Sequence, residues 1–240
     1  MGNTAVNHYL SQFIIRNFAP NHEQLYELNL KTGNIKPRSV LNLFSGRRLW
    51  NQEFEDKLTK TIENELSRVI RKVRNMPLAD RKEIFQAHEI TDKRDCDVIT
   101  RIVFQPLLFQ AKDSEKAIKN LELFLDNSEY MKPPSQIFCV RIRKEMAAIT
   151  PLVLIDNLLY LCPVYVNSPE VAAHIAFVYP VSPYEFILFL SCQDVMLFLE
   201  QHQYSVHEIN MRAITQQNKE CRIASSNKAY LELIKKTIGA

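Results

Sequence analysis

The chain has 240 residues and a formal net charge of +3; 46% of its residues are hydrophobic, 24% charged and 10% aromatic. This composition excludes a disordered or collagen-like chain, and the length allows a core that needs neither disulfides nor a metal. Glycine occurs only at positions 2, 33, 46 and 239. The long glycine-free interval excludes the phosphate-binding loops of Rossmann and P-loop enzymes, because those loops need backbone to approach phosphate closely.

The cysteines and the apolar segments indicate a compartment. The cysteines are odd in number and include no Cys-x-x-Cys pair, which predicts reduced thiols and neither a zinc site nor a disulfide framework; they are Cys96, Cys139, Cys162, Cys192 and Cys221. The opening residues lack the pattern of a secretory signal. Asp156 and Pro163 interrupt the longest apolar stretch before it reaches the length of a membrane span. We therefore expect a cytoplasmic protein without a membrane segment.

The first 130 residues are expected to be rich in helix. The segment 8–18 is a short candidate helix, and residues 25–30 and 35–40 form a predicted hairpin that turns at Gly33. Apolar residues repeat every three or four positions from 54 to 73, which predicts a long helix over 52–75. Further helices are expected over 80–91, 96–112 and 114–127, and Pro133-Pro134 ends this part.

The periodicity changes after these prolines. Residues 136–143, 152–155, 174–179 and 185–191 have strand patterns, helices are expected over 193–202, 205–219 and 226–237, and 220–224 is a last strand. This order predicts a single α+β domain over 1–240. Its helix-rich part (1–130) packs on a mixed or mainly antiparallel sheet formed by the strand-rich part (136–191) and the 220–224 strand, and closing helices occupy 193–237.

Several segments resemble the domain of unknown function 4238 family. The start His8-Tyr9-Leu10-Ser11-Gln12-Phe13 is similar to its His-Tyr-Val-Pro-Gln-Phe signature, and the resemblance extends over about residues 7–232 through an acidic helix at 61–66, an Asp-Asn turn at 156–157 and a Pro-x-Ser-Pro strand start at 180–183. Ser11, Ile155 and Leu158 depart from the family pattern, and residues 107–110 lack an arginine that is expected after Gln105. The resemblance implies a role in single-gene anti-phage defence.

His8, Gln12 and Arg16 are spaced four residues apart. On a helix they share one face, and there the histidine is a candidate acid–base group and the arginine a candidate clamp for an anion. The alternative is structural: His8 and Gln12 hydrogen-bond the backbone, and Arg16 pairs with a carboxylate such as Glu63. The resemblance adds Tyr9 as a candidate binding residue.

Two acidic positions also interrupt apolar surroundings. Glu63 lies beside the apolar stripe of the long helix and needs a partner if it is half-buried. Asp156-Asn157 either forms a tight turn or contributes to a site at the end of a strand. We predict that His8, Arg16, Glu63 and Asp156-Asn157 converge in one polar pocket, with His8, Arg16, Glu63 and Asp156 as the candidate catalytic residues.

A basic segment next to an aromatic residue predicts contact with nucleic acid. Residues 36–82 have twelve Lys/Arg and six Asp/Glu, and Arg47 and Arg48 lie close to Trp50. The alternative is the ordinary solvated face of an amphipathic helix. The spacing of Arg81 and His88 resembles the Arg–His spacing of helical ribonucleases. Such spacings are no more frequent in this chain than chance predicts.

Two functions are consistent with these patterns. The first is a toxin-like defence effector that acts on nucleic acid, such as a hydrolase or transferase for a phosphate-containing substrate, with Tyr9, Gln12, Asn157, Arg47, Arg48 and Trp50 binding the substrate. The second is a non-catalytic protein that senses or inhibits a phage component. No metal and no cofactor are expected, and the oligomeric state stays open.

Overall fold

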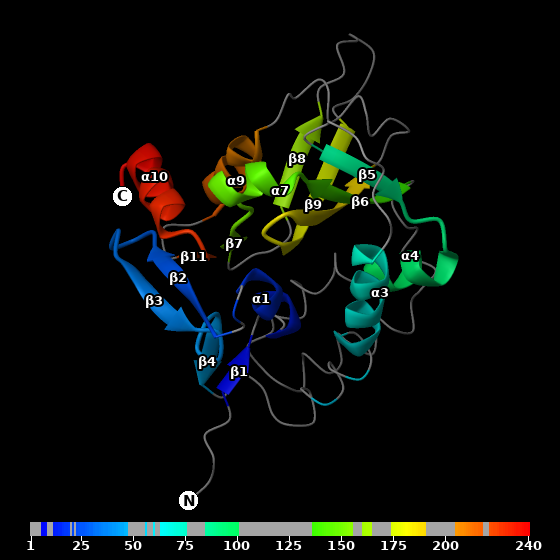
Figure 1. Cartoon of the computed structure of the whole chain (residues 1–240), viewed down its shortest axis with the longest axis horizontal. Helices are drawn as coiled ribbons and strands as arrows, with labels where there is room; N and C mark the ends of the chain where they lie inside the picture. Colours follow the sequence, from blue (N-terminus) through cyan, green and yellow to red (C-terminus); the bar gives the residue numbers. More distant parts are fainter. Residues whose placement is uncertain are drawn as a thin grey trace, which may run out of the picture.

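The computed structural model shows an α+β protein with two antiparallel sheets and a two-stranded ribbon (Figure 1). It describes residues 6–8, 12–19, 21, 23–47, 56, 60, 63–75, 85–100, 136–155, 160–164, 174–190, 205–217 and 221–240. The α+β class predicted from the sequence is confirmed.

The larger sheet has five strands in the order β5-β6-β10-β9-β8, and all neighbouring strands are antiparallel. These strands are β5 (Phe85–Glu89), β6 (Gln136–Ile142), β8 (Tyr160–Val164), β9 (His174–Ser182) and β10 (Glu185–Leu190). Consecutive residues of β6 and β10 are buried, from 137 to 142 and from 185 to 189. Because successive side chains of a strand point to opposite faces, both faces of the sheet are covered at these strands.

The smaller sheet joins the early and late parts of the chain. Its order is β3-β2-β11-β7, formed by β2 (Gln24–Asn29), β3 (Ile35–Ser39), β7 (Leu154–Ile155) and β11 (Arg222–Ser225). The hairpin of β2 and β3 turns at Gly33, whose φ of +66° favours glycine. The side chain of Asn29 accepts hydrogen bonds from the backbone N–H groups of Lys31 and Thr32. The predicted hairpin is therefore confirmed.

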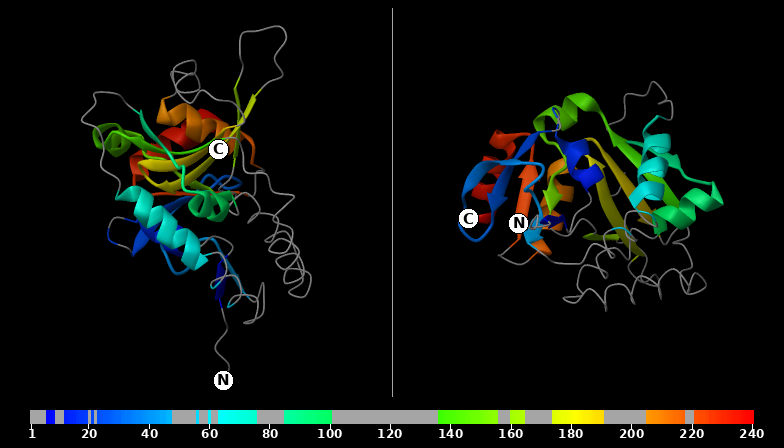
Figure 2. Two further views of the ribbon diagram at one scale, coloured as in Figure 1. Left: turned by 90° about the vertical axis from the view of Figure 1, so that its right-hand side faces the viewer. Right: turned by 90° about the horizontal axis from the view of Figure 1, so that it is seen from below.

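Helices cover the sheets and form one end of the molecule. Among the described residues they are α1 (Gln12–Phe18), α3 (Asn64–Arg74), α4 (Lys93–Thr100), α7 (Lys144–Ile149), α9 (Val206–Thr215) and α10 (Lys228–Ile238). α1 packs on β9, α9 on β8, and α10 on β2 and β11, while α3 and α4 pack on each other. Figures 1 and 2 show α10 with the β2–β3 hairpin at one end and α3 with α4 at the opposite end.

Buried apolar residues from both sheets form one core cluster. α1 contributes Ile14, Ile15 and Phe18, which leaves Arg16 on its exposed side. Local signals fix the later helices: Ser205 and Glu208 form a capping box at the start of α9, and the Asn227 side chain caps α10. Within the described residues, no helix is both long and apolar enough to cross a bilayer.

Two predictions about the sheets are wrong. Residues 85–89 form the edge strand β5 instead of part of a helix over 80–91, and Phe85 packs edge-on against Phe186 with ring centroids 6.4 Å apart. The pairing of β5 with β6 outweighs the helix preference of the local sequence, because strand formation depends strongly on cross-strand packing. The single sheet expected from residues 136–190 and the 220–224 strand is divided in two: β11 pairs with β7, as expected for that range, but also with β2, in a sheet separate from β6, β9 and β10. The first half of the chain therefore supplies strands to both sheets.

Most other predicted elements are confirmed within a few residues. This holds for the strands expected at 136–143, 152–155, 174–179 and 185–191 and for the helices at 205–219 and 226–237. The helix expected over 52–75 is α3 from residue 64, and the helix expected over 96–112 begins earlier, as α4 at Lys93. The helices expected at 114–127 and 193–202 lie outside the described residues.

Candidate functional site

The opening residues pair with the basic segment in a two-stranded ribbon. β1 (Val6–His8) runs antiparallel to β4 (Ser45–Arg47), with His8 opposite Ser45 and Val6 opposite Arg47 (Figure 1). Positions 8 and 47 are thus diagonal neighbours in the ribbon, although 38 residues separate them in the sequence. The ribbon joins the candidate acid–base position to the segment expected to contact nucleic acid.

α1 begins four residues after β1 ends. His8 therefore lies in a strand, so the prediction that His8, Gln12 and Arg16 share a helical face is wrong for His8 and holds for Gln12 and Arg16. Gln12 Nε2 donates a hydrogen bond to the backbone carbonyl of Val40, at 3.0 Å, and Gln12 Oε1 is buried without a hydrogen bond to any described residue. The bond from Gln12 ties the start of α1 to the turn that precedes β4.

Glu63 lies directly before α3 and is half-buried. Tyr179 on β9 is fully buried; burial raises its pKa above the ordinary value, and the negative charge of Glu63 raises it further. Because α1 also packs on β9, Arg16 and Glu63 belong to segments that meet at the same strand. A direct contact between Arg16 and Glu63 stays a prediction.

The remaining predicted site residues lie outside the described part of the chain. These are Tyr9, Arg48, Trp50, Asp156 and Asn157. Ile155, directly before the Asp-Asn pair, is buried and ends β7, where it pairs with Ile223 of β11. The expected convergence of Asp156 with His8 and Glu63 therefore stays a prediction.

A polar network that sequence reasoning missed lies between α3 and the larger sheet. Glu185 is 2% exposed and accepts a hydrogen bond from Arg141 Nε at 2.9 Å and one from Ser182 Oγ at 2.9 Å. Arg74 Nε lies 2.7 Å from the same carboxylate. Arg141 also donates to the backbone carbonyls of Val73 and Arg74 at the end of α3. One buried carboxylate thus joins two strands to the end of a helix.

The same network reaches α1. Arg74 donates to Asn17 Oδ1 and to the hydroxyl of Tyr184, each at 3.0 Å. Burial lowers the pKa of Arg74, but the charge of Glu185 and the bond to Tyr184 raise it, and the net effect is an increase. Arg141, one of two arginines in the largely apolar stretch 136–143, was the sequence signal that could have revealed this network. The arrangement has a structural role, because Arg74 and Arg141 both donate hydrogen bonds to acceptors within the protein.

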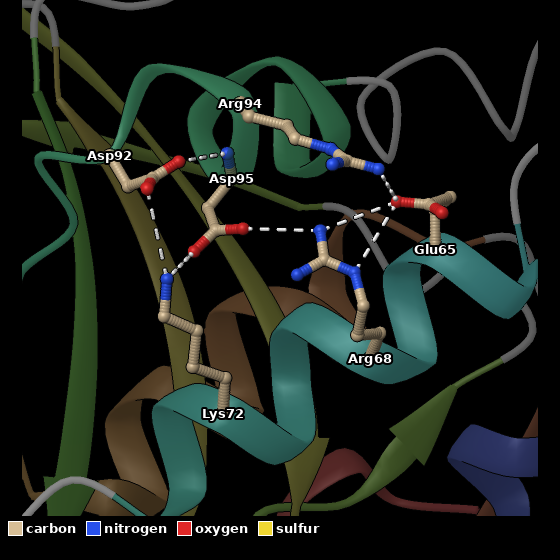
Figure 3. A network of polar contacts seen from close by, with 6 residues as sticks. All are labelled: Glu65, Arg68, Lys72, Asp92, Arg94 and Asp95. Carbon is tan, nitrogen blue, oxygen red and sulfur yellow. Dashed lines mark hydrogen bonds and ion pairs between the residues drawn. The ribbon is translucent and has the colours of Figure 1, made fainter.

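Three charged residues of α3, Glu65, Arg68 and Lys72, pair with residues at the start of α4 (Figure 3). Asp95, whose side chain is 4% exposed, lies 2.5 Å from Lys72 Nζ and 3.3 Å from Arg68. Glu65 lies 3.3 Å from Arg68 and 3.5 Å from Arg94. The hydrogen bond from the Asp95 N–H, together with the charge of Lys72, holds the pKa of the Asp92 carboxyl below its usual value.

This pairing changes the interpretation of the basic segment. Residues 63–75 and 85–100 together have six Lys/Arg and six Asp/Glu. Arg68 and Lys72 pair with carboxylates, and Arg74 belongs to the Glu185 network. The part of the basic segment that lies on α3 is therefore neutral together with α4, while the contact of the basic segment with nucleic acid stays a prediction. His88 lies on β5, so the helical Arg81–His88 pair is wrong.

Comparison with known proteins identifies a family resemblance. Residues 7–105 match the model of a family described as a protein of unknown function, DUF4238. The matched segment spans the ribbon, α1, the β2–β3 hairpin, α3, β5 and α4, so the resemblance seen in the opening signature is confirmed for this part of the chain. No curated protein and no solved structure matches the chain.

Proposed function

We propose that the protein is a cytoplasmic anti-phage defence effector that acts on nucleic acid, with its chemistry at the β1–β4 ribbon and α1. The pairing of β1 with β4 is the observation that carries this proposal. It joins position 8, a candidate acid–base group, to Arg47 and to the segment that continues to Arg48 and Trp50. An acid–base group next to cations is the combination that phosphate chemistry requires.

Each candidate residue has a role in this proposal. His8 transfers a proton to or from the reacting oxygen, and Arg16, which is exposed on α1, holds a phosphate oxygen with Arg47. Glu63 and Asp156 orient His8 or the nucleophile. Arg48 and Trp50 bind the phosphate and stack on a base, as single-stranded nucleic acid requires.

The experiment that tests this proposal is a phage challenge of cells that express the wild type or His8→Ala. We expect the substitution to abolish protection at equal protein level. His88→Ala removes a histidine from β5, away from the ribbon, and is the matched control, so it should still protect. Protection by His8→Ala equal to that of the wild type would exclude catalysis by His8.

One observation favours a second candidate, a non-catalytic protein that binds a phage component. Gln12, a predicted substrate-binding residue, donates its side-chain N–H to the carbonyl of Val40 and so has a structural role. In this case substitutions at His8 or Gln12 would act through stability, at a cost on the order of 1–3 kcal/mol. Thermal unfolding separates the two candidates. A lowered melting temperature in step with lost protection supports the binding protein, and unchanged melting with lost protection supports the effector.

A further inference from the structure

The positive charge of the described residues gathers at the end of the molecule that contains the β2–β3 hairpin and α10. Residues 23–44 and 221–240 together have seven Lys/Arg and three Asp/Glu, a local charge of +4 in a chain of net charge +3. The opposite end, with α3 and α4, is neutral as described above. Figures 1 and 2 show the two ends on opposite sides of the larger sheet. The charge is thus asymmetric along the molecule.

Two of the cations at this end lie on an open edge strand. β3 is the outer strand of the smaller sheet and pairs only with β2 among the described strands. Lys36 is exposed, Pro37 has no N–H to offer a further strand, and Arg38 is partly exposed. The edge of β3 is therefore unsuited to pairing with another strand. It presents positive charge instead.

α10 extends this line of charge past the hairpin turn. A Cβ at Gly33 would lie 3.2 Å from Lys235 Cε and 3.0 Å from the carbonyl carbon of Ala240. The last turn of α10, with Lys235 and Lys236, therefore packs against the turn that begins β3. We call Lys36, Arg38, Lys235 and Lys236 the β3 basic strip.

Carboxylates neutralise little of the β3 basic strip. Glu27 is buried and lies 3.3 Å from Arg38 and 3.6 Å from Arg222, so one negative charge faces two guanidinium groups. Lys36, Lys235 and Lys236 form no ion pair with a described residue, in contrast to Arg68 and Lys72 of α3. An anionic partner can therefore bind the strip without displacing a protein carboxylate from the lysines.

We infer that the β3 basic strip binds the phosphate backbone of single-stranded nucleic acid and leads it to the β1–β4 ribbon. β3 spans roughly 16 Å at about 3.3 Å per residue, enough to meet several successive phosphates. Figure 1 shows that β3 runs from the α10 end towards β4, where the proposed chemistry lies. The four cations come from one strand and the adjoining last turn of one helix, and the proposed stacking of a base on Trp50 requires a single strand. This inference rests on the proposed function, because it assigns the substrate of the same site.

The test measures binding of a fluorescent single-stranded RNA or DNA of mixed sequence by anisotropy, at several salt concentrations. Lys36→Glu with Lys236→Glu should weaken binding about tenfold, and the neutral pair Lys36→Gln with Lys236→Gln should reduce the salt slope by about 1.4, since each contact with a single strand contributes about 0.7. Circular dichroism would show whether charge reversal at the end of α10 impairs folding. In that case the neutral pair still tests the inference.

The matched control reverses two exposed lysines away from the strip, Lys93 at the start of α4 and Lys144 at the start of α7. It changes the net charge equally and should bind like the wild type. An equal loss of binding in both double variants would exclude the β3 basic strip as the binding surface and would leave nucleic acid as the target. No binding by the wild type would contradict the proposed nucleic-acid function itself. Unchanged binding with new self-association of the Lys36/Lys236 variant, seen by size-exclusion chromatography, would show that these charges only protect the strand edge and would overturn the inference.

Discussion

At residue 185 a single carboxylate faces two guanidinium groups that are mostly removed from water. Arg141 is 10% exposed and Arg74 26% exposed, and each uses its Nε atom on Glu185. A buried ion pair is weak evidence for net stabilisation, because desolvation offsets much of the attraction, but removal of one partner leaves an uncompensated charge. The Glu185 network therefore links α1 and the end of α3 to the sheet through one buried carboxylate.

We expect Glu185→Ala to lower the free energy of unfolding by about 3–5 kcal/mol, because both arginines would lose their shared partner. Urea denaturation measures this change. Glu145→Ala is the matched control: its carboxylate is 77% exposed and lies 3.7 Å from Arg143, so it should change stability by less than about 1 kcal/mol. Equal costs for the two substitutions would mean that the buried arginines find other partners.

At the scale of elements, Asp95 joins α4 to α3 through two ion pairs. This carboxylate is buried at the start of α4, yet its partners Arg68 and Lys72 are about half exposed. Asp92 accepts the N–H of Asp95 at 3.0 Å and thereby starts the helix. α4 thus depends on the Asp92 side chain for its start and on α3 for its position.

The substitution Asp95→Asn should therefore loosen the contact between α3 and α4 and cost about 1–3 kcal/mol, since the charge-assisted bonds are lost in a buried place. Asp97→Asn removes an exposed carboxylate from the same helix and should change stability by less than about 0.5 kcal/mol. Hydrogen exchange of the α4 amides would locate the effect. Faster exchange with Asp97→Asn than with Asp95→Asn would contradict this account.

Elements with strong local signals were predictable from the sequence. The capping residues Ser205 and Asn227 and the turn at Gly33 fix boundaries without help from distant residues. β1 and β5 were not predictable, because Val6–His8 is mostly polar and Phe85–Glu89 becomes a strand only by pairing with β6, far along the chain. The Glu185 network was missed for the same reason: its two arginines are distant from Glu185 in the sequence, and no local pattern relates the three residues.

At the scale of the whole molecule, a buried thiol and a buried phenol make the folded state less stable at high pH. Burial raises the pKa of Cys139 to about 12, and burial also raises the pKa of Tyr230 to about 12 although the bond from Asn210 lowers it. In the unfolded chain the thiol ionises at about pH 8.5 and the phenol at about pH 10. The folded pKa values are raised, so the contribution of these groups is fully present below about pH 8 and is lost as the pH rises towards about 12.

We expect the free energy of unfolding to fall by roughly 3–5 kcal/mol between about pH 8 and pH 11, since each tenfold change in an ionisation equilibrium corresponds to about 1.4 kcal/mol. Guanidinium denaturation at the two pH values measures this fall. Cys139→Ala should lose more than half of it, because the pKa of the thiol lies further above its ordinary value than that of Tyr230. An unchanged pH dependence in this variant would show that Cys139 does not titrate on unfolding.

The central place of β11 in the smaller sheet also determines when this sheet can close during translation. β2 ends at residue 29 and its partner β11 begins at residue 222. At a synthesis rate of about 5–20 residues per second, the hairpin waits roughly 10–40 s for that strand. Any product that stops before residue 222 leaves one edge of β2 without its partner, and α10, which supplies half of the β3 basic strip, is still absent.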